Sequence, residues 1–255
     1  MSASVEVASG EAFLRALGDD AALLHPQIAA QLRTPASLAR GDGVFTRAGS
    51  RYRLLNLLIV PLLGREAIVT RFAADVPFSL RTESALWTVS AGATASAGAG
   101  GADAPGGSAS PDGSGSPEGS AESTTERATL RTMREFHFPG GVQRVSDLLT
   151  TSTYPGLVRV QLGVRRRIEL IEECTVGDGG TLRIRTRRAA LHLGGRRFAL
   201  RGVLAVRADV EDGWDEVNER RTIVATVRNP LFGTLLEYRG WYRHTPVAGP
   251  DGDAQ

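Results

Sequence analysis

The second half of the chain alternates apolar and polar residues with a period of two, and this pattern constrains the fold most. Within residues 157–164, Val158 and Val160 fall on one face and Arg159 and Gln161 on the other. Successive side chains of a β-strand point to opposite faces, so this spacing predicts strands with one buried and one solvated face. Similar runs cover residues 182–187, 198–206, 217–227 and 234–242.

Short segments rich in glycine, aspartate or asparagine separate these predicted strands. They are residues 176–180, 194–195, 209–213 and 229–230. Loops of this length join antiparallel neighbours, because a parallel pair needs a crossover of about a dozen residues or more. The second half is therefore predicted to be an antiparallel meander.

The first part of the chain has helix-like apolar spacing. Together with the meander, it predicts an α+β fold: a predominantly antiparallel sheet, as a curved sheet or a partly open barrel, with two to three N-terminal helices packed on it. The predicted elements are helices over residues 11–17, 21–33 and 52–63, a short strand over 44–47, and a strand pair or one bent strand over 67–80.

Residues 90–127 consist largely of Ala, Gly, Ser, Pro and acidic residues without apolar periodicity. Such a segment cannot bury enough apolar surface to offset its chain entropy, so we expect a disordered insertion. A dinucleotide fingerprint starting at Gly98 fails, because position 103 is Asp and no strand and helix bracket it. Residues 1–89 and 128–245 are then expected to form one domain, followed by a disordered tail over 246–255.

The composition argues against several classes of site. Cys174 is the single cysteine, so an internal disulfide is excluded. The four histidines lack short ligand spacings, so we expect no metal site, and no cofactor motif is present. The N-terminus has no basic region followed by an apolar core, which favours a cytoplasmic protein. The apolar run over 54–63 is shorter than the roughly 20 residues that span a bilayer.

All 30 basic residues are arginine, and the formal charge is +2. Without the five acids of residues 90–126 and the two of the C-terminal tail, the remainder carries a formal +9. Arg183, Arg185 and Arg187 fall on one predicted strand face. No aromatic residues interleave with them as a stacking platform for nucleic acid would require, so a solvated face is favoured.

The motif Asn229-Pro-Leu-Phe-Gly233, followed by Tyr238-Arg-Gly-Trp241, resembles the bacterial domain-of-unknown-function family 4166. Weaker matches are His25-Pro26 and Arg134-x-Phe136, where Thr132 stands in place of a tryptophan frequent in the family. The resemblance covers most of residues 20–244. It implies no catalytic residue, and it suggests a separate dehydrogenase-like partner, because family members often follow short-chain-dehydrogenase-like or saccharopine-dehydrogenase-like domains.

Arg134, Tyr238, Arg239 and Trp241 are the candidate ligand-binding residues, because guanidinium, phenol and indole groups suit an anionic or aromatic ligand. The separation of two puts Arg239 and Trp241 on one strand face. In the structural alternative, Arg239 pairs with Glu135 or Glu237 and Trp241 fills the core.

No catalytic residues can be assigned from the sequence. Glu172 and Glu173 would raise rather than lower the pKa of the neighbouring Cys174 thiol. We therefore expect a soluble binding module with a cleft for a small anionic or lipid-like ligand. The alternatives are a structural or protein-interaction domain that acts with a separate oxidoreductase, and an enzyme of unrecognised class.

Overall fold

The computed structural model describes residues 7–52, 60–64, 66–90, 124–152 and 154–247. Its helices and 3-10 turns are α1 (Glu11–Leu17), η1 (Gly18–Leu23), α2 (Pro26–Arg33), η3 (Asp178–Gly180) and η4 (Gly202–Leu204). Its strands are β1 (Leu38–Gly49), β2 (Phe72–Ala73), β3 (Val76–Ser90), β4 (Thr124–Phe138), β5 (Gly141–Thr151), β6 (Leu157–Leu162), β7 (Ile168–Val176), β8 (Leu182–Leu193), β9 (Arg196–Ala199), β10 (Arg207–Asp215), β11 (Arg220–Asn229) and β12 (Gly233–Val247).

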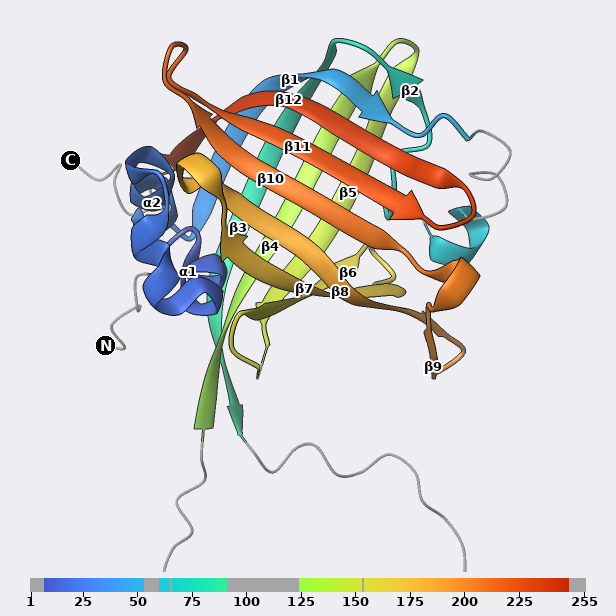
Figure 1. Cartoon of the computed structure of the whole chain (residues 1–255), viewed down its shortest axis with the longest axis horizontal. Coiled ribbons are helices and arrows are strands. Elements are labelled where there is room, and N and C mark those ends of the chain that lie inside the picture. Colours follow the sequence, from blue (N-terminus) through green and yellow to red (C-terminus); the bar gives the residue numbers. More distant parts are fainter. Residues whose placement is uncertain (1–6, 53–59, 65, 91–123, 153, 248–255) are drawn as a thin grey trace, which may run out of the picture.

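Ten of the strands close into an antiparallel barrel (Figure 1). The order runs β10-β11-β12-β1-β3-β4-β5-β6-β7-β8, and an additional β8–β10 pairing joins its two ends. Strand β9 continues beyond β8 as a hairpin, and β2 pairs with β1. The predicted antiparallel meander is confirmed, but the barrel is more closed than the predicted curved sheet or partly open barrel.

The closure of the barrel depends on strand β10, which the sequence pattern did not predict. Residues 209–213 were predicted to be a turn, yet they lie in the middle of β10 and pair with β11 on one side. On the other side, residues 209–212 pair with residues 182–185 of β8. The strand predicted over 198–206 is also wrong, because β9 ends at Ala199 and the η4 turn follows.

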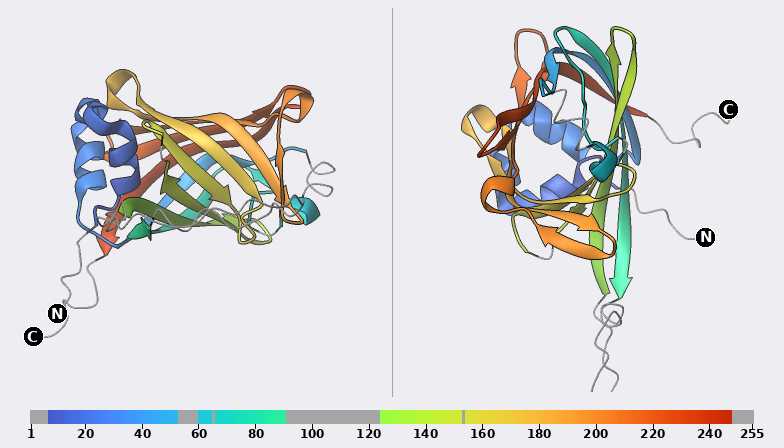
Figure 2. Two further views of the ribbon diagram at one scale, coloured as in Figure 1. Left: turned by 90° about the horizontal axis from the view of Figure 1, so that it is seen from below. Right: turned by 90° about the vertical axis from the view of Figure 1, so that its right-hand side faces the viewer.

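The N-terminal helices pack at one end of the barrel, as Figure 2 shows. Ile28 of α2 is fully buried there, in an apolar cluster that includes Val158 and Leu182 from the barrel wall. Pro26 starts α2, and the side chain of His25 accepts a hydrogen bond from the Gln27 amide at 3.3 Å. The predicted helix over 11–17 is confirmed, whereas the one over 21–33 is divided into η1 and α2.

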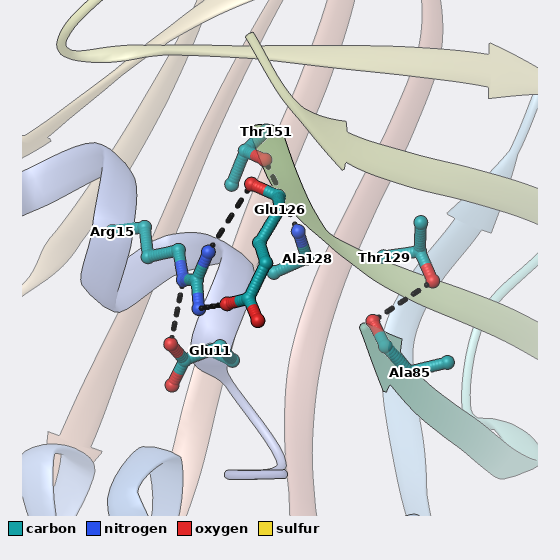
Figure 3. A network of polar contacts seen from close by, with 7 residues as sticks. All are labelled: Glu11, Arg15, Ala85, Glu126, Ala128, Thr129 and Thr151. Atoms are coloured by element: carbon teal, nitrogen blue, oxygen red, sulfur yellow. Dashed lines mark hydrogen bonds and ion pairs between the residues drawn. The ribbon is translucent and has the colours of Figure 1, made fainter. Parts of the chain in front are cut away.

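A polar network fastens α1 to the barrel wall (Figure 3). The Arg15 guanidinium donates to Glu11 Oε1 at 2.7 Å, and to the main-chain oxygen and a carboxylate oxygen of Glu126 on β4, both at 3.3 Å. Next to it, the Ala128 amide donates to Thr151 Oγ1 at 3.2 Å. The Arg15 contacts fix α1 to the start of β4, and the Ala128–Thr151 bond joins β4 to β5 beside it.

The antiparallel meander sends alternate turns to the same end of the barrel. The turns at residues 154–156, 177–181 and 216–219 lie at the helix end. The turns at residues 139–140, 163–167, 194–206 and 230–232 lie at the opposite end, here called the distal end.

Two other sequence predictions concern segments at the limits of the described chain. Residues 60–63 are helical, and the rest of the helix predicted over 52–63 falls mostly on residues 53–59, outside the described residues. The same holds for residues 91–123 of the predicted insertion and for the predicted tail. Ser90 and residues 124–127, which we had included in the insertion, belong to β3 and β4. No helix of the described chain is long and apolar enough to cross a membrane.

Candidate functional site: the barrel interior

The inward-facing side chains of β4 change from apolar to polar and back to apolar. Leu130 belongs to the apolar cluster at the helix end, and Phe136 belongs to a second apolar cluster with Phe45. Thr132 and Arg134 lie between these two clusters on the same face of the strand. Directly paired residues of neighbouring strands share a face, so the registers extend this polar zone around the inner wall.

We call this zone the polar belt. Its members come from seven other strands as well as from β4. They are Thr82, Ser84, Thr132, Arg134, Asp147, Glu172, Thr186, Asp212, Arg221, Tyr238, Tyr242 and His244.

Arg134 and Asp147 form an ion pair inside the barrel. The distance from Arg134 Nη2 to Asp147 Oδ2 is 2.9 Å. Only 9% of the Asp147 side chain is accessible, whereas 29% of the Arg134 side chain is. A guanidinium has five N–H donors, and a single nitrogen makes this contact. Arg134 therefore keeps donors that face accessible space within the closed wall.

Arg221, Asp212 and Tyr242 form a second, fully enclosed group. Arg221 donates to both Asp212 carboxylate oxygens, at 3.0 and 2.6 Å, and the Tyr242 hydroxyl donates to the second oxygen at 2.7 Å. Burial alone would lower the pKa of Arg221, but the charges of Asp212 and Tyr242 and the hydrogen bond to Asp212 together outweigh it, so the pKa is raised. Because Arg221 and Asp212 satisfy each other's hydrogen bonds, this group has a structural role and holds neighbouring strands of the wall together.

Glu172 is the belt carboxyl whose pKa departs most from its ordinary value. Burial, together with the negative charge of Asp147, raises the pKa of Glu172 to about 7, although a hydrogen bond from Thr186 Oγ1 at 3.0 Å opposes the shift. At or below neutral pH a large part of the Glu172 population is protonated. In that form the carboxyl is a hydrogen-bond donor.

Two buried polar groups of β12 have unused hydrogen-bonding capacity among the described residues. The main chain of Val69 contacts the inaccessible Tyr238 oxygen, but the hydroxyl proton has no acceptor, and the inaccessible His244 Nδ1 has no partner. Burial raises the pKa of Tyr238, so its hydroxyl keeps its proton. His244 Nε2 lies 3.4 Å from Thr82 Oγ1, and burial, reinforced by the charge of Arg221, lowers the pKa of His244 to about 4. Buried polar groups normally bind water, protein or ligand, so these two atoms are available to a molecule inside the barrel.

The inner wall is not packed as tightly as a solid core. Besides Arg134, the inward residues Leu80, Ile223 and Leu236 are only partly buried although the barrel encloses them. Accessible surface on an enclosed face means that space remains between the opposite walls. At the distal end there is also a hollow of about 580 Å³, lined by Val60, Pro61, Gly64, Glu66, Val164 and Arg165.

The structure separates the four residues predicted to bind a ligand. Tyr238 pairs with Ala225 on the inward face and lies close enough to Arg134 for the arginine charge to affect its pKa. Arg239 and Trp241 share a face, as predicted, but it is the outer one. Tyr238 and Arg134 are therefore brought together, whereas Arg239 and Trp241 lie outside the barrel.

The outer pair has its own contacts. Trp241 is half-buried beneath the guanidinium of Arg220, whose Cζ lies 4.4 Å from the ring centroid. Arg239 is exposed, and neither carboxylate predicted to hold it does so among the described contacts. Glu237 pairs with Arg47, and Glu135 pairs with Arg144.

Sequence reasoning missed Asp147, Glu172, Asp212, Arg221, Tyr242 and His244 as members of the site. A signal for Asp147 existed, since it interrupts the apolar face formed by Val145 and Leu149. Asp212 was hidden in the segment interpreted as a turn. The expected solvated face of Arg183, Arg185 and Arg187 is observed: each is ion-paired, with Glu211, Asp209 and Glu173 respectively.

Residues 117–242 match the model of the family described as "Domain of unknown function (DUF4166)". The chain belongs to that family. The match includes β4 to β12 up to Tyr242, and with them most of the polar belt. The expected extension of the resemblance toward residue 20 lies outside the matched region and stays a prediction.

No curated protein matches the chain. Among solved structures, an S-type phycobiliprotein lyase from Guillardia theta is similar, with 10% sequence identity over 84% of this chain and 89% of the other and a TM-score of 0.32. This likeness is too weak to transfer a ligand or an activity to this DUF4166 member.

Proposed function

We propose that this DUF4166 domain binds one small molecule inside the barrel, with an anionic head group at the polar belt and an apolar body along the wall. The observation that carries the proposal is Arg134, which faces inward, pairs with Asp147 through one nitrogen and still has 29% of its side chain accessible. An arginine with a purely structural role would resemble Arg221, which donates to both carboxylate oxygens of Asp212 and is 4% exposed.

Three groups that each interact with Asp147 supply donors for the head group. Arg134 has free N–H groups, the Tyr238 hydroxyl has no acceptor among the described residues, and Glu172 donates when it is protonated. A carboxylate or phosphate monoester accepts several such bonds at once. A cation would meet the charge of Arg134 and compete with it for Asp147, so an anionic head group is favoured.

The apolar clusters on either side of the belt suit the rest of such a ligand. Leu80 and Leu236 lie partly exposed on one side, and Leu86 and Leu162 on the other. Ligand sites commonly combine an apolar lining with a few convergent polar groups. We therefore favour a carboxylate-bearing, lipid-like ligand over a compact, highly charged one.

Native mass spectrometry of the purified protein and titration with a dansyl-labelled fatty acid test this proposal. Arg134→Met should weaken binding of the fatty acid by about tenfold or more, because a hydrogen bond to a charged group contributes about 1.5 to 3 kcal/mol. Tyr238→Phe, which changes one hydroxyl only, should weaken it by a smaller factor. Arg144→Met on the outer face is the matched control and should leave the affinity unchanged.

The expected result includes a co-purified mass that Arg134→Met loses and Arg144→Met keeps. Because Arg134→Met leaves Asp147 without its partner, the fold of the variant is checked by circular dichroism. Tyr238→Phe provides the second, nearly isosteric variant. Equal affinity of wild type, Arg134→Met and Tyr238→Phe would refute an interior site at the polar belt.

A further inference from the structure

The exposed apolar residues of the described chain gather at the distal end. Of thirteen large apolar residues that are exposed, ten belong to this end. Val203 and Leu204 on η4 are each 64% exposed, and Leu231 in the β11–β12 turn is 67% exposed. The other members are Tyr52, Leu62, Val142, Val164, Leu193, Phe198 and Phe232.

Hydrogen bonds link neighbouring turns of this end to one another. Asn229 donates to the main-chain oxygens of Val203 and Ala205, which ties the β11–β12 turn to η4. The Tyr52 hydroxyl donates to the main-chain oxygen of Phe232. On the other side of the rim, Arg167 donates to the main-chain oxygen of Leu62 at 2.7 Å.

Arginines interleave with these apolar residues, and acids are scarce. Residues 163–167, 193–207 and 228–234 contain eight arginines and no aspartate or glutamate. Arg165, Arg166, Arg196, Arg201 and Arg228 are exposed, and none makes an ion pair within the described chain. Glu66 and Asp75 are the acids described in the connection between β1 and β3, where Arg51 and Arg71 also lie.

The helix end has the opposite character. Its turns and helices carry six acids against two arginines, Arg15 and Arg33. The acids are Glu11, Asp19, Asp20, Asp178, Glu216 and Glu219. Among the exposed large apolar residues, only Leu23, Tyr154 and Val217 belong to that end. The barrel is therefore electrically polarised along its length, and its positive end is also its apolar end.

We propose that the distal end docks peripherally on an anionic lipid bilayer. Exposed apolar side chains on separate turn tips insert among the head groups, while the surrounding arginines contact lipid phosphates. The right-hand view of Figure 2 looks onto this end of the barrel. An acidic protein would complement the charge, but apolar residues dispersed over several tips suit a fluid surface better than one fixed groove.

Sedimentation with lipid vesicles tests the docking. The full chain should bind vesicles of equimolar phosphatidylcholine and phosphatidylglycerol roughly tenfold or more better than vesicles of phosphatidylcholine alone. Raising the salt concentration should weaken the binding, because salt screens exposed charges. Leu204→Ser with Leu231→Ser should reduce binding several-fold, whereas Leu23→Ser with Val217→Ser at the helix end should not.

Charge variants separate a local effect from net charge. Arg165→Gln with Arg166→Gln removes two positive charges from the distal end, and Arg40→Gln with Arg131→Gln removes two exposed charges from elsewhere on the barrel. Only the first pair should weaken vesicle binding strongly. Equal losses from both pairs, or no binding to the anionic vesicles, would overturn bilayer docking. If the anionic vesicles are not bound, an acidic protein becomes the better candidate for the partner of this surface.

The docking is independent of the interior ligand. Arg134→Met should lose the fatty acid and keep vesicle binding, whereas the distal variants should keep the fatty acid and lose the vesicles. Each proposal can therefore fail without the other.

Discussion

Arg221 and Arg239 show how strand register decides the role of an arginine. Arg221 faces inward from β11, is 4% exposed and binds Asp212 through two nitrogens. Arg239 lies on the adjacent strand β12 but faces outward into solvent. The motif Tyr238-Arg239-Gly240 made the exposed arginine a candidate site residue. Spacing along a strand shows which residues share a face, but it does not show whether that face points into the barrel or into solvent.

The two arginines should respond very differently to substitution. Arg221→Met leaves the buried carboxylate of Asp212 without its cation, so it should lower the free energy of unfolding by about 3 to 5 kcal/mol. Arg239→Met should cost less than about 0.5 kcal/mol, as for other surface changes. Urea denaturation measures both. Comparable losses in the two variants would contradict the register that turns Arg239 outward.

Glu172 should make the protein less stable as the pH rises. Its pKa is raised from an ordinary value of 4.5 to about 7 in the folded protein. Below pH 4.5 the protonated Glu172 carboxyl makes its full contribution to the stability of the folded state. This contribution is lost as the pH rises through the folded-state pKa of about 7. The full effect of this shift is roughly 3 kcal/mol. Glu172→Gln should remove this loss.

His244 acts in the opposite direction and requires a difference measurement. Its pKa is lowered from 6.5 to about 4, so its contribution is present above the higher value and is lost as the pH falls toward the lower one. Urea denaturation of wild type and Glu172→Gln across the range between these values isolates Glu172, because His244 is common to both. If the two stability curves run parallel, Glu172 does not titrate as proposed.

At the scale of elements, the β3–β4 hairpin joins the two parts of the sequence. Its strands extend to Ser90 and from Thr124 and are paired to those ends. The composition of residues 91–123 predicts a segment that packs no core. We propose that this insertion is dispensable for folding.

Replacing residues 91–123 by a short Gly-Ser linker should shift the thermal midpoint by only a few degrees. The cost of closing a loop varies slowly with its length, so the register of β3 and β4 should persist. Differential scanning calorimetry measures the midpoint. A parallel replacement that also removes residues 124–130 should be far more damaging, because Ala128 and Leu130 are buried in the core. A large loss from the first replacement would show that the insertion is packed.

At the scale of the whole molecule, the sequence predicted the strands better than their closure. Period-two alternation identifies a strand and its two faces, as in β6, and short glycine turns identify antiparallel neighbours. Closure requires β10 to pair with β8 across the β9 hairpin, and no local spacing reports that contact. The acidic run Glu211-Asp212-Gly213 resembled a turn, although Glu211 and Asp212 find arginine partners on neighbouring strands.

The same limit explains why most of the candidate site could not be predicted from the sequence. Arg134 and Tyr238 were identified by residue type, whereas most of the polar belt exists only after strands distant in sequence form one wall. Asp147 on β5 and Glu172 on β7 come close enough inside the barrel for the charge of Asp147 to contribute to the raised pKa of Glu172.

A disulfide across the closing seam tests the closed barrel. Arg185 and Asp209 are direct partners on β8 and β10 and form an outward ion pair at 3.1 Å. Direct antiparallel partners have the separation that a disulfide needs, so Arg185→Cys with Asp209→Cys should cross-link on mild oxidation. The bond would close a loop of about 25 residues and should stabilise the oxidised form by about 3 kcal/mol, of which the lost surface ion pair offsets at most about 1 kcal/mol.

Thiol titration and mass spectrometry measure the cross-link, and urea denaturation with and without reductant measures its stability effect. Cys174 is buried, and burial raises the pKa of its thiol to about 12, so it should not compete. Arg185→Cys with Glu219→Cys, which joins β8 to a turn at the helix end, is the control and should stay reduced. An open sheet, the architecture that the sequence pattern also allowed, would leave the seam cysteines as free as those of the control, because β8 and β10 would then be separate edges.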